Sequence, residues 1–196
     1  MPISYRQEIY RKLIHLCSLS MPVGYHLFGK GTSIPVIFFA LLVALYIDLS
    51  RIFHLPGNGL FLKLIGSVLR EHEANKLSGA SYILLSGLIA IIFLDVPNAA
   101  AVMGFVILGD IAAALTGRRI GRIKLPGTNK TFEGSLGCLL VCIIVAMAAP
   151  GIRWETGLAG AVTATIAEAY SGRIDDNLAV AIVSGLSMIL TSWLLQ

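Results

Sequence analysis

Asp110 is an ionisable residue inside a long apolar stretch of the sequence. A charged side chain within a membrane helix is costly, so a residue of this kind usually marks a substrate, ion or catalytic site. On a helix, Asp110 shares one face with Ala113, Ala114 and Gly117. Small residues on that face leave room either for a neighbouring helix or for a ligand beside the carboxylate. We therefore predict a functional role for Asp110.

The segment after Asp110 combines the residue types that a polyphosphate requires. It contains Arg118, Arg119, Arg122, Lys124 and Lys130, followed by Thr131, Glu133, Gly134, Ser135 and Gly137. Basic side chains pair with phosphate oxygens, and glycines ahead of a helix N-terminus free backbone N–H groups. A loop that only sets membrane topology would explain the arginines but not the run Lys-Thr-Phe-Glu-Gly-Ser. The P-loop pattern G-x-x-x-x-G-K-[ST] does not occur, so a P-loop fold is not implied.

A further group of acidic residues lies near the C-terminus. Glu168 ends one apolar segment, and Asp175, Asp176 and Asn177 precede the next. Helix capping would explain one of these acids. Carboxylates and an amide on one membrane face are typical ligands of a hard cation, and Mg²⁺ or another divalent cation fits them better than zinc. The predicted metal ligands are Asp110, Glu133, Asp175, Asp176 and Asn177.

Near the N-terminus, Glu8, Arg11, Lys12 and His15 have the spacing of one helix face. This stripe has two interpretations. It could anchor the first membrane helix through basic residues and a helix salt bridge, or it could belong to the functional site. An ordinary anchor does not require His15 on the same face, and the spacing alone leaves both interpretations open.

The elements that must position these residues are membrane helices. The 196 residues are 56% hydrophobic and 13% charged, whereas soluble domains are about a quarter charged. We predict a single all-α domain over 1–196, a polytopic transmembrane helix bundle of about seven spans, with six to eight possible. The seven apolar segments are Leu13–Phe28, Ser33–Ile47, Gly79–Leu94, Pro97–Thr116, Ser135–Ala149, Gly157–Tyr170 and Leu178–Leu195.

The distribution of basic residues predicts the orientation of this bundle. With a cytoplasmic N-terminus, thirteen of the fifteen Lys and Arg residues fall inside, and only Lys30 and Arg153 fall outside. We therefore predict a multi-pass integral membrane protein with its N-terminus and active site in the cytoplasm. The basic residues lie in short loops, so nucleic acid is not an expected partner. The cytoplasmic loop 49–78 is expected to carry an interfacial helix.

Taken in order, these motifs resemble the membrane lipid-kinase family that includes dolichol kinase, phytol kinase and the yeast-type CTP-dependent diacylglycerol kinase. The resembling motifs are Glu8-x-x-Arg11-Lys12-x-x-His15, Arg70-Glu71-His72-Glu73 with Leu77-Ser78-Gly79-Ala80-Ser81-Tyr82, Gly109-Asp110-x-x-Ala113, Gly117-Arg118-x-x-Gly121, Lys130-Thr131-x-Glu133-Gly134-Ser135-x-Gly137, Glu168 and Asp175-Asp176-Asn177. The resemblance covers almost the whole chain.

The resemblance implies transfer of the γ-phosphoryl group from CTP to the hydroxyl of a membrane lipid alcohol, which could be a polyprenol or dolichol, a phytol-like alcohol or diacylglycerol. It implies catalytic roles for Asp110, Glu133 and Lys130, with the acids acting as metal ligands or as the base. The expected nucleotide contacts are Arg11, Lys12, Gly109, Gly117, Arg118, Gly121, Lys130, Thr131, Gly134 and Ser135. The expected supporting residues are Glu8, His15, Glu73 and Glu168.

Two other functions fit parts of the same sequence. The core also resembles that of phosphatidate cytidylyltransferase, which would make a CDP-lipid, although this chain is short and its N-terminal motif is similar to that of the kinases. A small transporter could also use an acid such as Asp110 inside the membrane. A transporter would predict polar residues on both faces, but the outer loops hold only Lys30, Asp95, Arg153 and Glu155 as charges. The sequence does not predict the oligomeric state.

Overall fold

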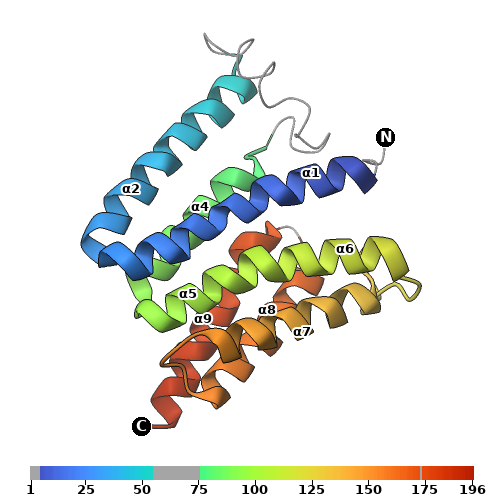
Figure 1. Cartoon of the computed structure of the whole chain (residues 1–196). Coiled ribbons are helices and arrows are strands. Elements are labelled where there is room, and N and C mark those ends of the chain that lie inside the picture. Colours follow the sequence, from blue (N-terminus) through green and yellow to red (C-terminus); the bar gives the residue numbers. More distant parts are fainter. Residues whose placement is uncertain (1–4, 55–75, 173) are drawn as a thin grey trace.

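The computed structural model describes residues 5–54, 76–172 and 174–196, and these ranges are built almost entirely of helices (Figure 1). A single isolated bridge between Lys124 and Thr131 is the nearest approach to a sheet within them. The helices are α1 Tyr5–Leu16, α2 Ser20–Ile52, α4 Gly79–Phe93, α5 Val96–Gly104, α6 Asp110–Ile120, α7 Phe132–Ala148, α8 Trp154–Tyr170 and α9 Asp176–Leu194. The prediction of an all-α fold is confirmed.

The N-terminal helices form one long segment that bends at a glycine. A 3₁₀ turn, Cys17–Leu19, joins α1 to α2 without a break in direction, and the chain then turns sharply within α2 (Figure 1). At the bend Gly29 has φ +70° and ψ −177°, a backbone conformation that side chains with a Cβ rarely adopt. The two apolar segments predicted here, Leu13–Phe28 and Ser33–Ile47, lie on either side of this residue.

A second continuous segment, Val96–Ile120, runs through the centre of the bundle. It consists of α5, the π-helical turn η3 (Phe105–Gly109) and α6. Phe105 and Ile107 are fully buried, and η3 contacts α1 and every helix from α4 to α9. π-Helical turns interrupt the regular hydrogen bonding of a helix and are frequent at functional sites. Asp110 is the first residue after this turn.

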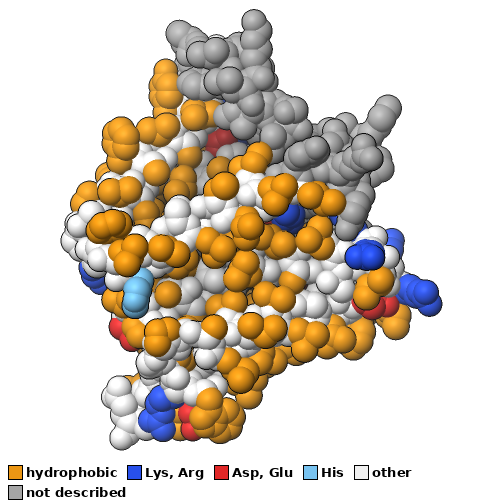
Figure 2. Space-filling model, viewed as in Figure 1, with side chains coloured by type: hydrophobic (Ala, Val, Ile, Leu, Met, Phe, Trp, Pro, Cys, Tyr) orange, Lys and Arg blue, Asp and Glu red, His pale blue; other side chains and the backbone are white. Residues whose placement is uncertain are grey.

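Small residues fill part of the bundle interior, and many large apolar side chains are exposed on its outside. Ala99, Ala161 and Ala164 are completely buried, whereas the side chains of Phe39 and Trp193 are more than two-thirds exposed. Figure 2 shows hydrophobic side chains covering most of one face of the molecule. Helices in a bilayer associate through small residues and direct their large apolar side chains toward lipid. This distribution identifies an integral membrane protein.

The structure supports the membrane segments without fixing their number. Within the described ranges three segments are long and apolar enough to cross a bilayer, and two further apolar helices are shorter. The three are Arg11–Ile52, Val96–Ile120 and Asp176–Leu194, and the shorter two are Gly79–Phe93 and Phe132–Ala148. All seven predicted apolar segments coincide largely with helices, but the count of about seven spans stays a prediction. The interfacial helix predicted in the 49–78 loop falls mainly on residues outside the described ranges.

Candidate active site

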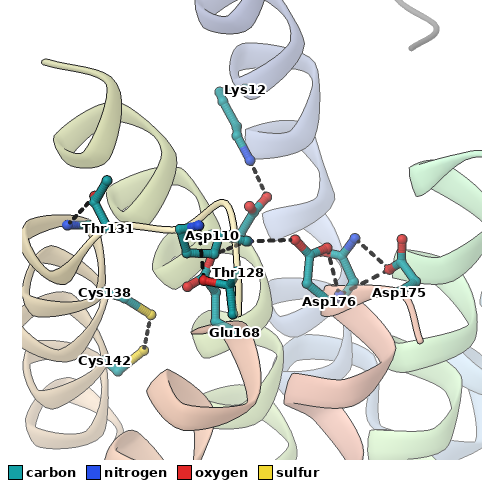
Figure 3. Close-up of polar contacts among 12 residues, drawn as sticks. Lys12, Asp110, Thr128, Thr131, Cys138, Cys142, Glu168, Asp175 and Asp176 are labelled. Carbon is teal, nitrogen blue, oxygen red and sulfur yellow. Dashed lines mark hydrogen bonds and ion pairs between the residues drawn. The ribbon is translucent and has the colours of Figure 1, made fainter. Parts of the chain in front are cut away.

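Three carboxylates from three helices converge at one end of the bundle. Asp110 begins α6, Glu168 lies in the last turn of α8, and Asp176 begins α9 (Figure 3). One oxygen of each lies within 4.8 Å of the others. Glu168 is only 2% exposed, and the other two are partly buried. This spacing suits a single cation bound between the three side chains.

Two lysines from different parts of the chain contact these carboxylates. Lys12, a buried residue of α1, forms an ion pair with Asp110. His15, one turn further along α1, places Nε2 3.6 Å from Oδ2 of the same carboxylate. The N-terminal stripe therefore meets the site through Lys12 and His15, which supports the functional interpretation of that stripe.

Lys130 contacts the other two carboxylates. Its Nζ forms an ion pair with Glu168 and lies 3.1 Å from Oδ2 of Asp176. Burial alone would lower the pKa of this ammonium, but the charges of Asp176 and Glu168 outweigh burial and raise its pKa above the ordinary value. Lys130 therefore stays protonated and contributes a positive charge to the site.

The three carboxylates and Lys130 border a cavity of about 330 Å³. Small residues of α6 form one wall, and the Lys130 loop with the start of α7 forms another. The lining residues are Asp110, Ala113, Ala114, Gly117, Arg118, Asn129, Lys130, Thr131, Gly134, Ser135, Glu168 and Asp176. The alanines on the face of Asp110 thus leave space for a ligand, one of the two possibilities left open by the sequence.

A tight hairpin between α6 and α7 positions Lys130. The Phe132 N–H donates to the Ile123 carbonyl at 2.8 Å, and the Leu125 N–H donates to the Lys130 carbonyl at 3.0 Å. Thr131 then caps α7, because its hydroxyl accepts a hydrogen bond from the Gly134 N–H at 3.2 Å. The backbone of Lys130 is consequently held on both sides while its side chain reaches into the cavity.

The glycines near this hairpin allow α6 and α7 to approach closely. A Cβ on Gly117 would lie 2.9 Å from the Thr131 hydroxyl, and one on Gly134 would lie 2.9 Å from the Ala113 carbonyl. Gly121 is similarly crowded, by the Gly117 carbonyl and by Thr131. Gly109 faces the thiols of Cys138 and Cys142, away from the hairpin. Gly109 and Gly121 thus allow close packing at these points, and their nucleotide contacts stay predictions.

The start of α7 offers fewer backbone N–H groups than the sequence suggested. The N–H of Phe132 is bonded to Ile123, that of Gly134 to the Thr131 hydroxyl, and that of Ser135 to the Thr131 carbonyl. The Ser135 hydroxyl, by contrast, is buried and has no hydrogen-bond partner among the described residues. Side chains on the cavity wall, rather than these amides, are thus the available phosphate contacts.

Several predicted ligands lie beside the three-carboxylate group rather than in it. Glu133 accepts a hydrogen bond from the Ile123 N–H at 3.2 Å and so braces the hairpin. Asp175 caps α9 by accepting from the N–H and the side-chain amide of Asn177. Burial and the charge of Asp176 raise the pKa of Asp175 to about 6. Glu168, expected only in support, is the third carboxylate of the group with Asp110 and Asp176.

Two of the remaining predicted residues, Arg11 and Arg118, have described side chains, and two, Glu8 and Glu73, do not. Arg11 is half-buried on α1 directly before Lys12, and Arg118 is exposed at the cavity wall. Glu8 belongs to α1, but its side chain is not described, and Glu73 lies outside the described ranges. Sequence reasoning missed Asn129, which lines the cavity. Its position directly before Lys130 in a polar loop was the available signal.

A second polar cluster was not recognised as buried from the sequence. Asp48, near the end of α2, is 2% exposed and forms an ion pair with Arg51. It also accepts hydrogen bonds from Ser78 and Ser81 at the start of α4. Because Asp48 and Arg51 flank a long polar loop, the sequence allowed an exposed ion pair equally well. The cluster joins α2 to α4.

The comparison with known proteins adds one relative. The chain is 28% identical to "CTP-dependent diacylglycerol kinase 1" of Schizosaccharomyces pombe (strain 972 / ATCC 24843), over 95% of this chain and 94% of that protein. No family model and no solved structure matches. The near-complete coverage supports the CTP-dependent lipid-kinase family suggested by the ordered motifs, without selecting a member of it.

Proposed function

We propose that this protein is a lipid kinase that transfers the γ-phosphoryl group of CTP to the hydroxyl of a membrane lipid alcohol. The observation that carries the proposal is the convergence of Asp110, Glu168 and Asp176 with Lys130 beside the cavity. Phosphoryl transfer requires positioning and neutralisation of charge more than covalent chemistry from the protein. Carboxylates for a cation and ammonium groups for phosphates supply both.

The three carboxylates fit a divalent cation such as Mg²⁺. They offer hard oxygen ligands, and one oxygen of the buried Glu168, Oε2, has no hydrogen-bond partner among the described residues. A buried carboxylate oxygen in that state is costly unless a ligand satisfies it. Asp110, Glu168 and Asp176 would hold the cation, which would neutralise phosphate charge during transfer. Asp175 and Asn177 would support Asp176 through the α9 cap.

The phosphates of the nucleotide would lie against the hairpin side of the cavity. Lys130 and Arg118 supply positive charge there, and the buried Ser135 hydroxyl supplies a hydrogen-bond donor. Asn129 adds an amide at the same wall. In this arrangement the nucleotide enters from the cytoplasm, which agrees with the predicted orientation of the bundle.

The lipid hydroxyl would approach Asp110 from the bilayer side. Its oxygen attacks the γ-phosphorus, the bond to the departing CDP breaks, and the hydroxyl proton passes to the Asp110 carboxylate. Lys12 holds Oδ2 of that carboxylate in the ionised form, and His15 lies beside it. Diacylglycerol is the first acceptor to test because of the relative's name; polyprenols and phytol-like alcohols present the same hydroxyl on apolar tails.

The proposal can be tested by following the two ends of the CTP triphosphate. Purified protein in lipid nanodiscs is supplied with Mg²⁺, diacylglycerol and CTP labelled in either the α- or the γ-phosphate. Transfer of only the γ-label to lipid is the expected result, and parallel reactions with a polyprenol and phytol define the acceptor. Transfer of the α-label with release of pyrophosphate would establish a cytidylyltransferase instead.

A further inference from the structure

The position of Lys130 has a consequence for how the cation enters the site. Its ammonium contacts two of the three carboxylates that would bind a divalent cation, Glu168 and Asp176. The oxygens of these two and of Asp110 lie within 4.8 Å of one another. The ammonium therefore occupies part of the space between the carboxylates where a cation bound to this group would lie.

We propose that Lys130 is a stand-in cation, which occupies the divalent-cation site of the free protein and moves to the nucleotide phosphates when the metal–nucleotide complex binds. This inference rests on the proposed kinase function and adds an order of events to it. Free metal would bind weakly, because it must displace an ammonium that is already paired with Glu168 and Asp176. The metal–nucleotide complex brings phosphates that accept the displaced ammonium.

The charges around the site support a swap rather than joint occupancy. Three carboxylates face the ammonium groups of Lys12 and Lys130. A divalent cation on the same carboxylates as Lys130 would place like charges within a few ångströms of each other in a poorly solvated site, which is strongly unfavourable. Lys12 contacts one of the three carboxylates, Asp110, whereas Lys130 contacts the other two, so Lys130 is the ammonium that competes more directly with the incoming cation.

The mobility expected of the groups also points to Lys130 as the part that moves. Its side chain is 35% exposed, whereas that of Glu168 is 3% exposed. The hairpin holds its backbone through the Leu125 and Thr128 contacts, so movement is confined to a flexible four-carbon side chain. Because Ser135 and Arg118 line the same cavity, the ammonium can reach a phosphate held there without leaving the site.

A metal-binding titration of the full chain in nanodiscs, without nucleotide, tests the swap. Mn²⁺ binding is measured by electron paramagnetic resonance for the wild type, Lys130→Met and Lys124→Met. Lys130→Met should bind Mn²⁺ about tenfold more tightly, which corresponds to about 1.4 kcal/mol. Lys124→Met removes the same charge from the same hairpin but from outside the cavity, and its affinity should stay within about twofold of the wild type. Unchanged or weaker binding by Lys130→Met would overturn the inference.

A second measurement on the unaltered protein follows the exposure of Lys130 directly, and it decides the matter if Lys130→Met does not fold. Acylation of each lysine is followed by mass spectrometry with and without saturating Mn²⁺. Lys130 should react several-fold faster with Mn²⁺, because displacement from Glu168 and Asp176 exposes its amine to the reagent. An unchanged rate would contradict the swap even if the kinase assay succeeds. Absence of both Mn²⁺ binding and phosphoryl transfer in the wild type would instead reject the proposed function.

Discussion

Two buried carboxylate clusters in this protein differ in how completely their polar atoms are satisfied. At the Asp48 cluster, Oδ1 pairs with Arg51 at 3.1 Å, and Oδ2 accepts from the Ser78 N–H, the Ser78 hydroxyl and the Ser81 hydroxyl. At the Asp110 cluster, three carboxylates face two lysines, and Oε2 of Glu168 has no hydrogen-bond partner within the described part of the chain. Only the second cluster lines the 330 Å³ cavity.

The difference distinguishes a structural role from a binding role. A fully bonded buried ion pair holds two helices in register, and each partner is costly to remove. A cluster with excess negative charge and an unbonded oxygen is poised for a ligand that supplies the missing positive charge. Asp48 and Glu168 are buried to the same extent, so burial alone does not distinguish the structural cluster from the binding cluster. The following substitutions test that separation.

The largest effect is expected from Glu168→Gln. The amide keeps the shape of the side chain but removes the charge that would face the cation and Lys130, so the rate of phosphoryl transfer from CTP should fall by about 10²- to 10³-fold. The rate is measured per mole of monodisperse protein after size-exclusion chromatography. A rate within about twofold of the wild type would remove Glu168 from the site.

The matching change at the other cluster is Ser81→Ala. This residue donates a 2.7 Å hydrogen bond to Asp48, and loss of a buried hydrogen bond to a charged group should lower the free energy of unfolding by about 1.5–3 kcal/mol. The expected observation is a lower midpoint of thermal inactivation with a nearly normal rate per folded molecule. A large loss of rate without loss of stability would assign the Asp48 cluster to catalysis.

A smaller effect is expected where helix packing shapes the cavity. In Gly117→Ala the new Cβ would lie 2.9 Å from the Thr131 hydroxyl, so the α7 cap next to Lys130 must shift. We expect kcat/KM for CTP to fall about tenfold, because small displacements of positioning groups slow catalysis disproportionately. Gly24→Ala is the control, since nothing lies within 4 Å of its added Cβ. Equal behaviour of the two variants would contradict the packing argument.

The smallest effect should come from Glu133→Gln. In the structure this carboxylate braces the hairpin through the Ile123 N–H and lies outside the three-carboxylate group. The rate should therefore fall only about two- to fivefold, the loss expected for one weakened hydrogen bond at the hairpin. A loss comparable to that of Glu168→Gln would restore the catalytic role that the sequence predicted for Glu133.

The sequence predicts most of the fold because membrane helices are encoded locally. Apolar runs of sufficient length specify helices one by one, and Asp110 is conspicuous because it interrupts such a run. The bend at Gly29 was visible only as a glycine between two runs. Where each helix ends beside Gly29, and in which direction it then runs, depends on packing with segments that are distant in the sequence.

The site was harder to derive because its members meet only in three dimensions. Lys130 and Asp176 were predicted from motif chemistry and lie in contact with each other. Glu168, expected only in support, lies in the three-carboxylate group, whereas Glu133, predicted as a ligand, lies outside it. Both are acids at helix ends, and spacing along the chain does not tell which one points into the cavity. Whether Asp48 is satisfied by Ser78 and Ser81 likewise depends on a contact across some thirty residues of sequence.

The central claim is that the Asp110 cluster, not the Asp48 cluster, performs the chemistry. The most direct test measures transfer of the CTP γ-phosphate to diacylglycerol by Asp110→Asn and Asp48→Asn, each normalised to folded protein. We predict that Asp110→Asn loses about 10²-fold or more in rate, while Asp48→Asn loses thermal stability but keeps its rate within about threefold. An Asp110→Asn variant with the wild-type rate would contradict the account.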